Sequence, residues 1–512
     1  MEMNETARFK LLLAFMTMFI AVCYPVVKLY LETYLDNLSE KTIIKSNLSS
    51  DSIESEIIKA WNKLLKKPER KNIKIAIGMN TNVDLIISGT EFFKKLKLNE
   101  PNGIKNHEMI ENLKQFKECF MHFFRRGSAA ERFFTNSGDF EKVLELVTGL
   151  KQQWFIGGNA ALMAQGISKR FIDAEILLIG PVGPKLKELL SNNVRVLDDT
   201  FIEKDEVHLI LEYEAKETFE NIQTPQANRF IVSYDVKNSR MELIDEFFNI
   251  TSIQKPDITI ISGLHLLETQ NSSYRSETLK KLTNQLKNRL EKKMVHLELG
   301  SISEKFLMST ILNSGLLNEI NSLGLNEQEL LFLAYASEKA PHSNYYMESS
   351  GALEYIKIVD ILEWILSTYG SKANSKSQFS RIHFHYLKFH IIAENGAGEW
   401  SNSISSLVSG SKIAAKQACG FDFDDLSNEV ALEDFVEMKI PYEVDENKNI
   451  FLKMDQENAF KFNASEPVIQ FQRGNIQFYF TPTLVCKKPL KTVGLGDAIS
   501  SNGILYTEFR KI

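Results

Sequence analysis

A short loop near the end of the chain carries residue types suited to moving a phosphoryl group. It reads Gly494-Leu-Gly-Asp497 and runs into Ala-Ile-Ser-Ser501, small and apolar residues that favour the start of a helix. Glycine accepts φ > 0 and close approach of a ligand, and the first amides of a helix attract phosphate. A carboxylate at Asp497 could take the proton of an attacking hydroxyl. The loop therefore predicts a phosphoryl-transfer site, with an aspartate-capped turn as the alternative.

The first half of the chain supplies strands that end in polar residues. An apolar run at 74–78 is followed at once by Asn80 and Asp84. Residues 154–164 contain a glycine pair and Asn159 at the start of a small-residue helix. Polar residues after such strands lie where open α/β sheets bind ligands. We expect these residues to face a ligand, although a single asparagine is more often a turn or cap residue.

Strands and helices alternate over most of the chain, which predicts an α/β fold. Residues 258–263, 276–290 and 294–300 read as strand, helix and strand, the pattern of a parallel sheet with helices on both faces. Runs at 207–213 and 229–234 alternate more and suit a hairpin in a smaller sheet. We therefore expect a large domain with a central, mostly parallel sheet and a smaller lid domain built from discontinuous segments within 80–240.

Composition and charge point to a folded globular protein with an unusual N-terminus. The 512 residues are 44% hydrophobic and carry a net charge of −6, and no basic tract predicts nucleic-acid binding. Residues 11–27 form an apolar run, so 1–30 is interpreted as a cleaved signal peptide or a signal anchor. A polar lead-in at 31–71 would precede the catalytic region at 72–512. Localisation in the endoplasmic reticulum, lumenal or membrane-anchored, or secretion is expected, with membrane association only through this segment.

Cysteines and glycosylation sequons fit that compartment. Outside the apolar segment only Cys119, Cys419 and Cys486 remain, so at most one disulfide can form. The hypothesis is Cys419–Cys486, because both residues lie in the last third of the chain. Sequons for N-glycosylation occur at Asn37, Asn47, Asn249, Asn271 and Asn463.

Taken in order, the motifs resemble those of one family, the ADP-dependent sugar kinases of the ribokinase-like fold, and within it most resemble the animal, membrane-associated glucokinases. The resemblance runs from about residue 73 to the C-terminus. Its motifs are Gly-Met-Asn-Thr-Asn-Val-Asp84, Arg-Arg-Gly-Ser-Ala-Ala-Glu131, Gly-Gly-Asn159-Ala, Asn228-Arg-Phe, His296-Leu-Glu298, Asn326-Glu-Gln-Glu329, Arg381-Ile-His-Phe-His385 and Gly494-Leu-Gly-Asp497. No Gly-X-X-X-X-Gly-Lys-[Ser/Thr] is present, which excludes a P-loop.

The resemblance implies a reaction and a metal. It implies transfer of the β-phosphoryl group of ADP to the 6-hydroxyl of D-glucose, giving AMP and glucose 6-phosphate in glycolysis, by a monomeric enzyme. Asp497 would be the base, and Gly494 to Gly496 the anion hole. Glu298 and Glu329, expected to end sheet-type elements, would hold Mg²⁺ through water together with Asp497, because this ion keeps its hydration shell. For each carboxylate alone, a helix cap or a surface ion pair is the alternative.

The resemblance also assigns the substrates to residues. Glucose would contact Asn80, Asp84, Glu131, Gly158, Asn159 and His208. The nucleotide and its phosphates would contact Arg229, His385, Val493, Gly494, Leu495 and Gly496, with His385 at the adenine. His383 and His385 lack an obvious third partner for zinc, and core packing is their alternative.

Three other functions stay open. The nearest is ADP-dependent phosphofructokinase, although Glu131 suits free glucose better than a sugar phosphate. The others are an ATP-dependent sugar or nucleoside kinase of the same fold and an inactive, membrane-tethered sugar or nucleotide sensor. Retention of Asp497, Glu298 and Glu329 speaks against the sensor.

Overall fold

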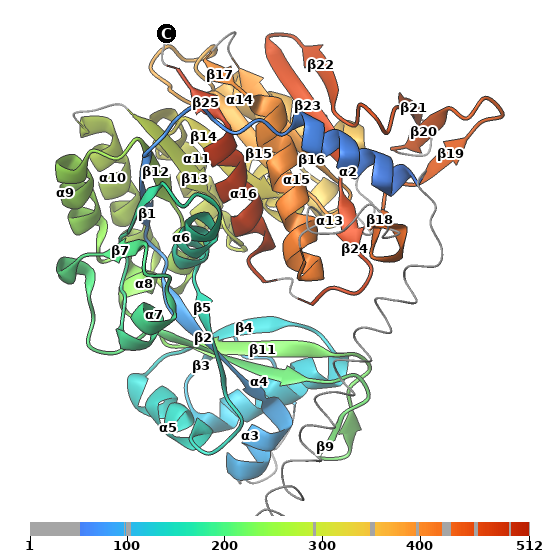
Figure 1. Cartoon of the computed structure of the whole chain (residues 1–512). Coiled ribbons are helices and arrows are strands. Elements are labelled where there is room, and N and C mark those ends of the chain that lie inside the picture. Colours follow the sequence, from blue (N-terminus) through green and yellow to red (C-terminus); the bar gives the residue numbers. More distant parts are fainter. Residues whose placement is uncertain are drawn as a thin grey trace, which may run out of the picture.

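The computed structural model describes residues 52–96, 98, 104–289, 293–348, 354–395, 399–421, 432–454, 459–490 and 493–510. The interpretation of 1–30 as a signal segment and the sequons at Asn37 and Asn47 fall outside this part of the chain. Within it, no helix combines the length and the apolar character needed to span a bilayer. The described residues form a larger and a smaller unit (Figure 1).

The larger unit is built on a sheet of ten described strands, in the order β22-β23-β16-β15-β14-β13-β12-β1-β6-β7. Neighbours from β15 to β7 are parallel, whereas β15–β16, β16–β23 and β23–β22 are antiparallel. Every residue of β13 and β15 is buried, as expected for strands covered on both faces. The strands are Lys74–Gly78 (β1), Glu175–Leu178 (β6), Val194–Val196 (β7), Ile258–Ile261 (β12), Met294–Glu298 (β13), Ser322–Asn326 (β14), Arg381–His385 (β15), Phe389–Asn395 (β16), Ile469–Arg473 (β22) and Ile476–Pro482 (β23).

Helices cover both faces of this sheet. One face carries α6 (Asn159–Arg170), α16 (Leu495–Tyr506) and α15 (Ser403–Cys419), and α2 (Ile53–Leu64) packs on α15. The other face carries α9 (Ile244–Gln254), α10 (Ser272–Asn288), α11 (Lys305–Asn313), α12 (Glu327–Ser337) and α14 (Tyr355–Tyr369). The short helices are α7 (Pro184–Leu189), α8 (Lys237–Arg240) and α13 (Tyr345–Glu348). This arrangement confirms the predicted parallel sheet between two helical layers.

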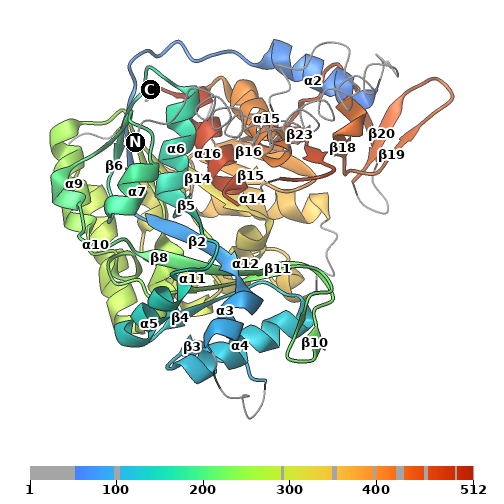
Figure 2. The same ribbon diagram turned by 60° about the horizontal axis from the view of Figure 1, so that its bottom comes forward.

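The smaller unit is a second sheet in the order β3-β4-β11-β8-β2-β5, drawn from two separate stretches of the chain. Its strands are Met109–Ile110 (β3), Ala130–Phe134 (β4), Asn228–Ser233 (β11), Val207–Tyr213 (β8), Asn82–Ser88 (β2) and Gln153–Gly157 (β5). The antiparallel pairing of β8 with β11 confirms the predicted pair of strands, joined by the small hairpin of Thr218–Phe219 (β9) and Ile222–Gln223 (β10). Helices α3 (Gly89–Leu96), α4 (Leu113–Arg126) and α5 (Ser137–Val147) lie on the side away from the larger unit (Figures 1 and 2).

Local sequence explains why α4 occupies its place under the small sheet. Asn112 caps the start by accepting a hydrogen bond from Gln115 N, and Gly127 ends the helix in the left-handed region at φ 61°. Phe116 and Phe120 fall on the buried face of α4 and pack against Phe230 of β11. Apolar residues at spacings of three and four predict a helix around 109–124, whereas the structure forms β3 first and begins α4 at Leu113.

The C-terminal third contains elements that the sequence analysis did not anticipate. They are the three-stranded sheet of Tyr442–Val444 (β19), Ile450–Lys453 (β20) and Ala459–Phe462 (β21), and the short pairs Val436–Met438 (β18) with Leu484–Cys486 (β24) and Trp400–Ser401 (β17) with Glu508–Phe509 (β25). A disulfide joins Cys419 at the end of α15 to Cys486 in β24, which confirms the predicted pairing, and Cys119 is free and buried.

Candidate active site

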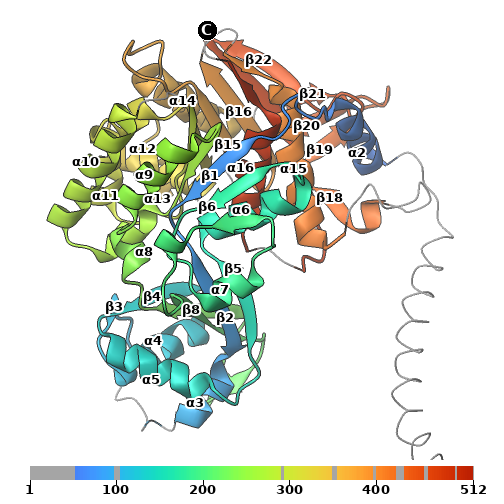
Figure 3. The ribbon, with the colours of Figure 1, turned by 60° about the vertical axis from the view of Figure 1, so that its left-hand side comes forward.

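The candidate site lies where the chain crosses from the large sheet to the small one. β1 leads into β2 through residues 79–81, as Figure 3 shows, and β5 returns into α6 at Gly157 and Gly158. Gly157 stands close against Asp84, since a Cβ on it would lie 2.2 Å from Asp84 Oδ1. Gly158 has φ 79°, a region that favours glycine, and caps α6. These two crossovers bring Asn80, Asp84 and Asn159 close together.

Asp497 lies in the first turn of α16, directly after the glycine loop. Gly494 is the N-terminal cap of this helix with φ 71°, and the amides that follow it have no partner inside the helix. Asp497 is buried, and its Oδ1 accepts a 2.8 Å hydrogen bond from Asn159 Nδ2. Asn159 Oδ1 in turn accepts from Asn80 Nδ2 at 3.1 Å. The structure thus connects Asn80, Asn159 and Asp497, which are distant in sequence.

The pKa of Asp497 is raised to about 7. Burial is the main cause, the charge of Glu298 adds to it, and the hydrogen bond from Asn159 and the charge of His385 oppose it. A carboxyl group with a pKa near 7 can lose and take a proton at neutral pH. This property suits a general base.

Glu298 is a buried carboxylate at the end of β13. Its Oε2 accepts a 3.2 Å hydrogen bond from His296 Nε2, and its Oε1 lies 3.6 Å from His385 Nε2. Burial alone would raise the pKa of Glu298, but hydrogen bonding and charge from the two histidines lower it to about 2. Gly324 of β14 leaves the space that this carboxylate occupies, because a Cβ there would lie 2.0 Å from Oε2.

Glu329 belongs to the first turn of α12 and not to the end of a strand, which corrects that expectation. Asn326 ends β14 and forms a capping box with Glu329: each side chain accepts from the backbone amide of the other. Burial raises the pKa of Glu329 to about 8, and the charges of Glu298 and Asp497 add to the shift. The buried carboxyl groups of Glu298, Glu329 and Asp497 therefore lie close enough to repel one another.

This donor set fits a divalent cation that prefers oxygen ligands. A positive ion between Glu298, Glu329 and Asp497 would offset their mutual repulsion, and carboxylate oxygens are the ligands that hard cations take. Among the described residues, no three His, Cys, Asp or Glu side chains are grouped closely enough to hold a metal ion on their own. Carboxylate oxygens of this kind suit a small divalent cation, which keeps part of its water shell.

His385 lies beneath the glycine loop. A Cβ on Gly496 would lie 3.0 Å from His385 Cε1, so the ring packs directly against the loop backbone. The structure thus places His385 beside the carboxylates and the loop, and its contact with adenine stays a prediction. His383 is fully buried, and no hydrogen-bond partner for either ring nitrogen is found among the described residues.

Three of the proposed sugar residues, Asp84, Glu131 and His208, lie on one face of the small sheet. The other three lie beside it: Asn80 is in the connection from β1 to β2, and Gly158 and Asn159 begin α6. Asp84 of β2 is the register partner of His208 on β8, and Glu131 of β4 lies close to that histidine, with Glu131 Oε1 3.6 Å from His208 Nδ1. Arg229 shares this face but lies further along β11, opposite Glu212. Val493 and Leu495 contribute backbone and packing to the loop, since Val493 O accepts from Gln417 Nε2 and Leu495 packs on the large core.

Two residues near this face were missed by the sequence analysis. Asn82 Nδ2 donates to Asp84 Oδ1 at 2.9 Å, and Asp235 Oδ2 accepts from His208 Nε2 at 2.8 Å. Asn82 stands in the same motif as Asp84, and Asp235 follows the end of a strand, so the rule applied to Asn80 would have found both.

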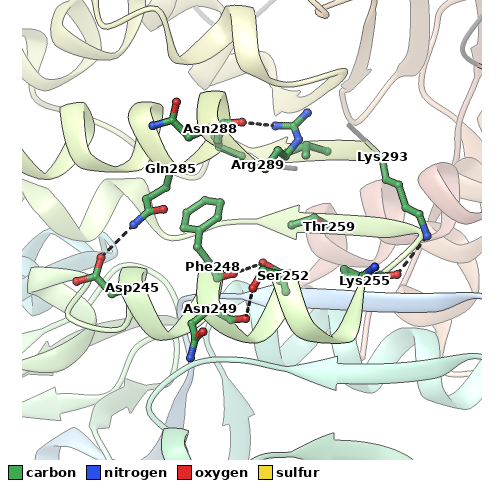
Figure 4. Close-up of a pocket in the computed structure, with 14 residues that line it drawn as sticks. Asp245, Phe248, Asn249, Ser252, Lys255, Thr259, Gln285, Asn288, Arg289 and Lys293 are labelled. Atoms are coloured by element: carbon green, nitrogen blue, oxygen red, sulfur yellow. Dashed lines mark hydrogen bonds between the residues drawn. The ribbon is translucent and has the colours of Figure 1, made fainter. Parts of the chain in front are cut away.

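A pocket elsewhere on the larger unit lies apart from this chemistry. It is about 380 Å³ in volume and is bounded by α9 and α10 (Figure 4). Two of its basic residues already have partners: Arg289 donates to the carbonyl of Glu319, and Lys293 pairs with Asp257. None of the predicted site residues lines this pocket.

Comparison with known proteins gives consistent results. Residues 73–506 match a family described as the ADP-specific phosphofructokinase/glucokinase conserved region. An ADP-dependent glucokinase of Bos taurus is 38% identical over 459 residues, 89% of each chain, and a probable ADP-dependent glucokinase of Caenorhabditis elegans is 36% identical over 91% of each. A phosphofructokinase of Pyrococcus horikoshii, solved with AMP, shares the fold at a TM-score of 0.64 and 19% identity, over 86% of this chain and 98% of that one. The predicted α/β kinase fold is thereby confirmed.

Proposed function

This chain belongs to the ADP-specific phosphofructokinase/glucokinase family, and from that premise we propose that it is an ADP-dependent glucokinase. The reaction would move the β-phosphoryl group of ADP to the 6-hydroxyl of D-glucose, releasing AMP and glucose 6-phosphate. The observation that carries the proposal is the 2.8 Å hydrogen bond between Asn159 and Asp497. It joins the segment proposed to bind the sugar to the base proposed to activate it.

In this mechanism Asp497 accepts the proton of the 6-hydroxyl as the oxygen attacks phosphorus. The amides of the glycine loop donate to the oxygens of the transferred group and stabilise the charge that develops on them. Asn159 orients Asp497 through its side-chain amide and holds Asn80 with its carbonyl oxygen. Movement of the small sheet toward the loop would exclude water, which otherwise competes as the acceptor.

Mg²⁺ is the proposed divalent ion, held through water by Glu298 and Glu329 beside Asp497. When bound, it would offset the negative charge of the phosphates and so favour approach of the sugar oxygen. His296 and His385 keep Glu298 ionised, since they lower its pKa to about 2. An ionised carboxylate is the form that such an ion requires.

Glucose is favoured over a sugar phosphate by the charge of the acceptor face. Asp84, Glu131 and Asp235 all lie near His208, so carboxylates outnumber the single cation among these four groups. A phosphate dianion there would meet like charges, whereas neutral hydroxyls can donate to carboxylates.

The test is glucose 6-phosphate formation by the purified full-length chain with Mg²⁺ and either ADP or ATP, in the presence of an adenylate kinase inhibitor. Turnover with ADP is expected, and turnover with ATP alone would contradict the proposal. Asp497→Asn should lower kcat at least about a hundredfold while glucose binding, measured by calorimetry, persists. Asp139→Asn on the distant helix α5 is the matched control, because its carboxylate pairs only with the exposed Lys142 among the contacts described. Near-normal turnover of Asp497→Asn would remove the assignment of the base.

We also propose that the enzyme works in the secretory pathway, on the endoplasmic reticulum membrane, in its lumen or after secretion. The apolar segment at 11–27 and the Cys419–Cys486 disulfide support this, because disulfides persist in oxidising compartments. The sequon residues Asn249, Asn271 and Asn463 are exposed. Protection from added protease in intact microsomes, and a mass shift after glycosidase treatment, are the expected results. Digestion in intact microsomes without any glycan would contradict this location.

A further inference from the structure

Asp235 stands directly behind the His208 ring. It follows β11, and its side chain is completely buried. Its Oδ2 lies 2.8 Å from His208 Nε2, and since a carboxylate can only accept, Nε2 carries a hydrogen in this contact. No hydrogen-bond partner for the other oxygen, Oδ1, is found among the described residues. The carboxylate therefore has one described role, which is to hold this ring.

The opposite edge of the ring faces the proposed sugar position. His208 Nδ1 lies 3.6 Å from Glu131 Oε1, which is too long for a hydrogen bond, and a hydroxyl placed beside this pair can reach both atoms. Asp84 lies beside His208 on the neighbouring strand. The His208 ring thus lies between the buried carboxylate of Asp235 on one side and the carboxylates of Glu131 and Asp84 on the other.

The surrounding charges decide which form of His208 exists. Burial alone would lower the pKa of His208, but the charge and hydrogen bond of Asp235 and the charges of Glu131 and Asp84 raise it to about 10. Two further titratable groups lie close by. Burial and the charge of His208 lower the pKa of His265 to about 4. The carboxylate of Glu206 accepts hydrogen bonds from the amides of residues 236–238, and burial together with the charge of Asp235 raises its pKa to about 7. At neutral pH the ring is therefore cationic.

We propose that Asp235 is a positioning residue for sugar binding, which keeps His208 doubly protonated and turned so that Nδ1–H donates to a glucose hydroxyl. The same hydroxyl would donate its own hydrogen to Glu131 or Asp84. Such a pairing uses both hydrogen-bonding functions of one hydroxyl and rejects a sugar that lacks it, because the charged groups would then lose a partner. The inference rests on the proposed function and names a group that this function did not include.

The first test compares Asp235→Asn with the wild type. The amide oxygen can still accept from Nε2–H, so the ring keeps its place, but the charge that holds the second proton is lost. We expect the KM for glucose to rise about tenfold near pH 8.5 and to return toward the wild-type value near pH 6, since hydrogen bonds from charged groups are the stronger ones. The KM for ADP should change less than about twofold. A rise in the glucose KM that is equal at both pH values, or a parallel rise for ADP, would overturn the proposal.

A double-mutant cycle separates this role from a general effect on folding. If Asp235 acts through His208 alone, Asp235→Asn should add less than about a twofold change in glucose KM to a His208→Gln enzyme. A full additional loss in that background would overturn the inference. Asp245→Asn on α9 is the matched control, since that residue is exposed and pairs with Lys281, and it should match the wild type.

A measurement without turnover keeps the proposal independent of the catalytic assay. In the wild-type protein labelled at the histidine rings, the NMR signal missing from His208→Gln belongs to His208. That signal should stay at the imidazolium position from about pH 6 to about pH 9. A His208 signal that titrates below pH 7 would overturn the role of Asp235 even if the enzyme is active. Failure of the wild type to form glucose 6-phosphate, with this signal still cationic, would instead refute the proposed function.

Discussion

Removal of the Asn159 side chain should displace the pH dependence of the reaction in a calculable way. Asn159 donates the 2.8 Å hydrogen bond to Asp497, and this bond is one of two influences that lower a pKa otherwise raised by burial and by Glu298. Hydrogen bonds to charged groups contribute about 1.5–3 kcal/mol, and one pKa unit corresponds to about 1.4 kcal/mol. In Asn159→Ala the pKa of Asp497 should therefore rise by about 1 to 2 units from its value of about 7.

The assay is kcat at saturating glucose and ADP, measured as a function of pH. Asp497 must be deprotonated to act as a base, so activity is lost as pH falls through its pKa. With the pKa raised to between about 8 and 9, kcat near pH 7 should fall roughly 5- to 50-fold, and it should recover as pH approaches about 9.5. The acidic limb of the profile should move upward by the same 1 to 2 units, roughly, as the pKa.

Asn80→Ala is the matched control, because it removes the bond from Asn80 to Asn159 and leaves the bond to Asp497 in place. Its acidic limb should move by less than about half a unit. If Asn159→Ala lowers kcat by the same factor at every pH while the limb stays in place, Asn159 acts only in binding. The argument that it tunes the base would then be wrong.

Two further predictions follow from packing and covalent structure. The methyl group of Gly157→Ala would lie 2.2 Å from Asp84 Oδ1, so the glucose KM should rise about tenfold while the ADP KM stays unchanged. Gly138→Ala is the control and should match the wild type, because its Cβ would have its nearest neighbour 3.8 Å away. Kinetic assays check this, and equal effects of the two substitutions would contradict the packing argument. The Cys419–Cys486 disulfide closes a span of 67 residues, for which loop entropy predicts a stabilisation of about 4 kcal/mol. Cys486→Ser should lower the free energy of unfolding, measured in urea, by up to that amount, and a reducing agent should destabilise the wild type alone. If the urea unfolding curves of the variant and the wild type coincide, the disulfide does not contribute this stability.

Many residues of the site could be predicted from the sequence, because they follow the end of a predicted strand or a glycine loop. Asp84, Glu298 and Asp497 each follow an apolar run or a glycine loop, and chain direction in a parallel sheet brings such ends to one edge. Asn82 and Asp235 meet the same condition, because Asn82 shares the motif of Asp84 and Asp235 follows the end of β11. Glu329 shows a limit of this rule: its part in the capping box of α12 depends on where β14 stops.

The sequence by itself determined much of the alternation of strands and helices, the candidate base, the candidate carboxylates and the limit of one disulfide among the three cysteines outside the apolar segment. These are local properties, because hydrophobic period, glycine placement and residue chemistry act over a few neighbouring positions. Only the tertiary structure decided that Asn159 bonds Asp497, that His385 and His296 both contact Glu298, and that Asp235 holds His208. These contacts join residues 2 to 338 positions apart, and the pKa values depend on them. Burial and charge are set by which segments meet, and no single segment contains that information.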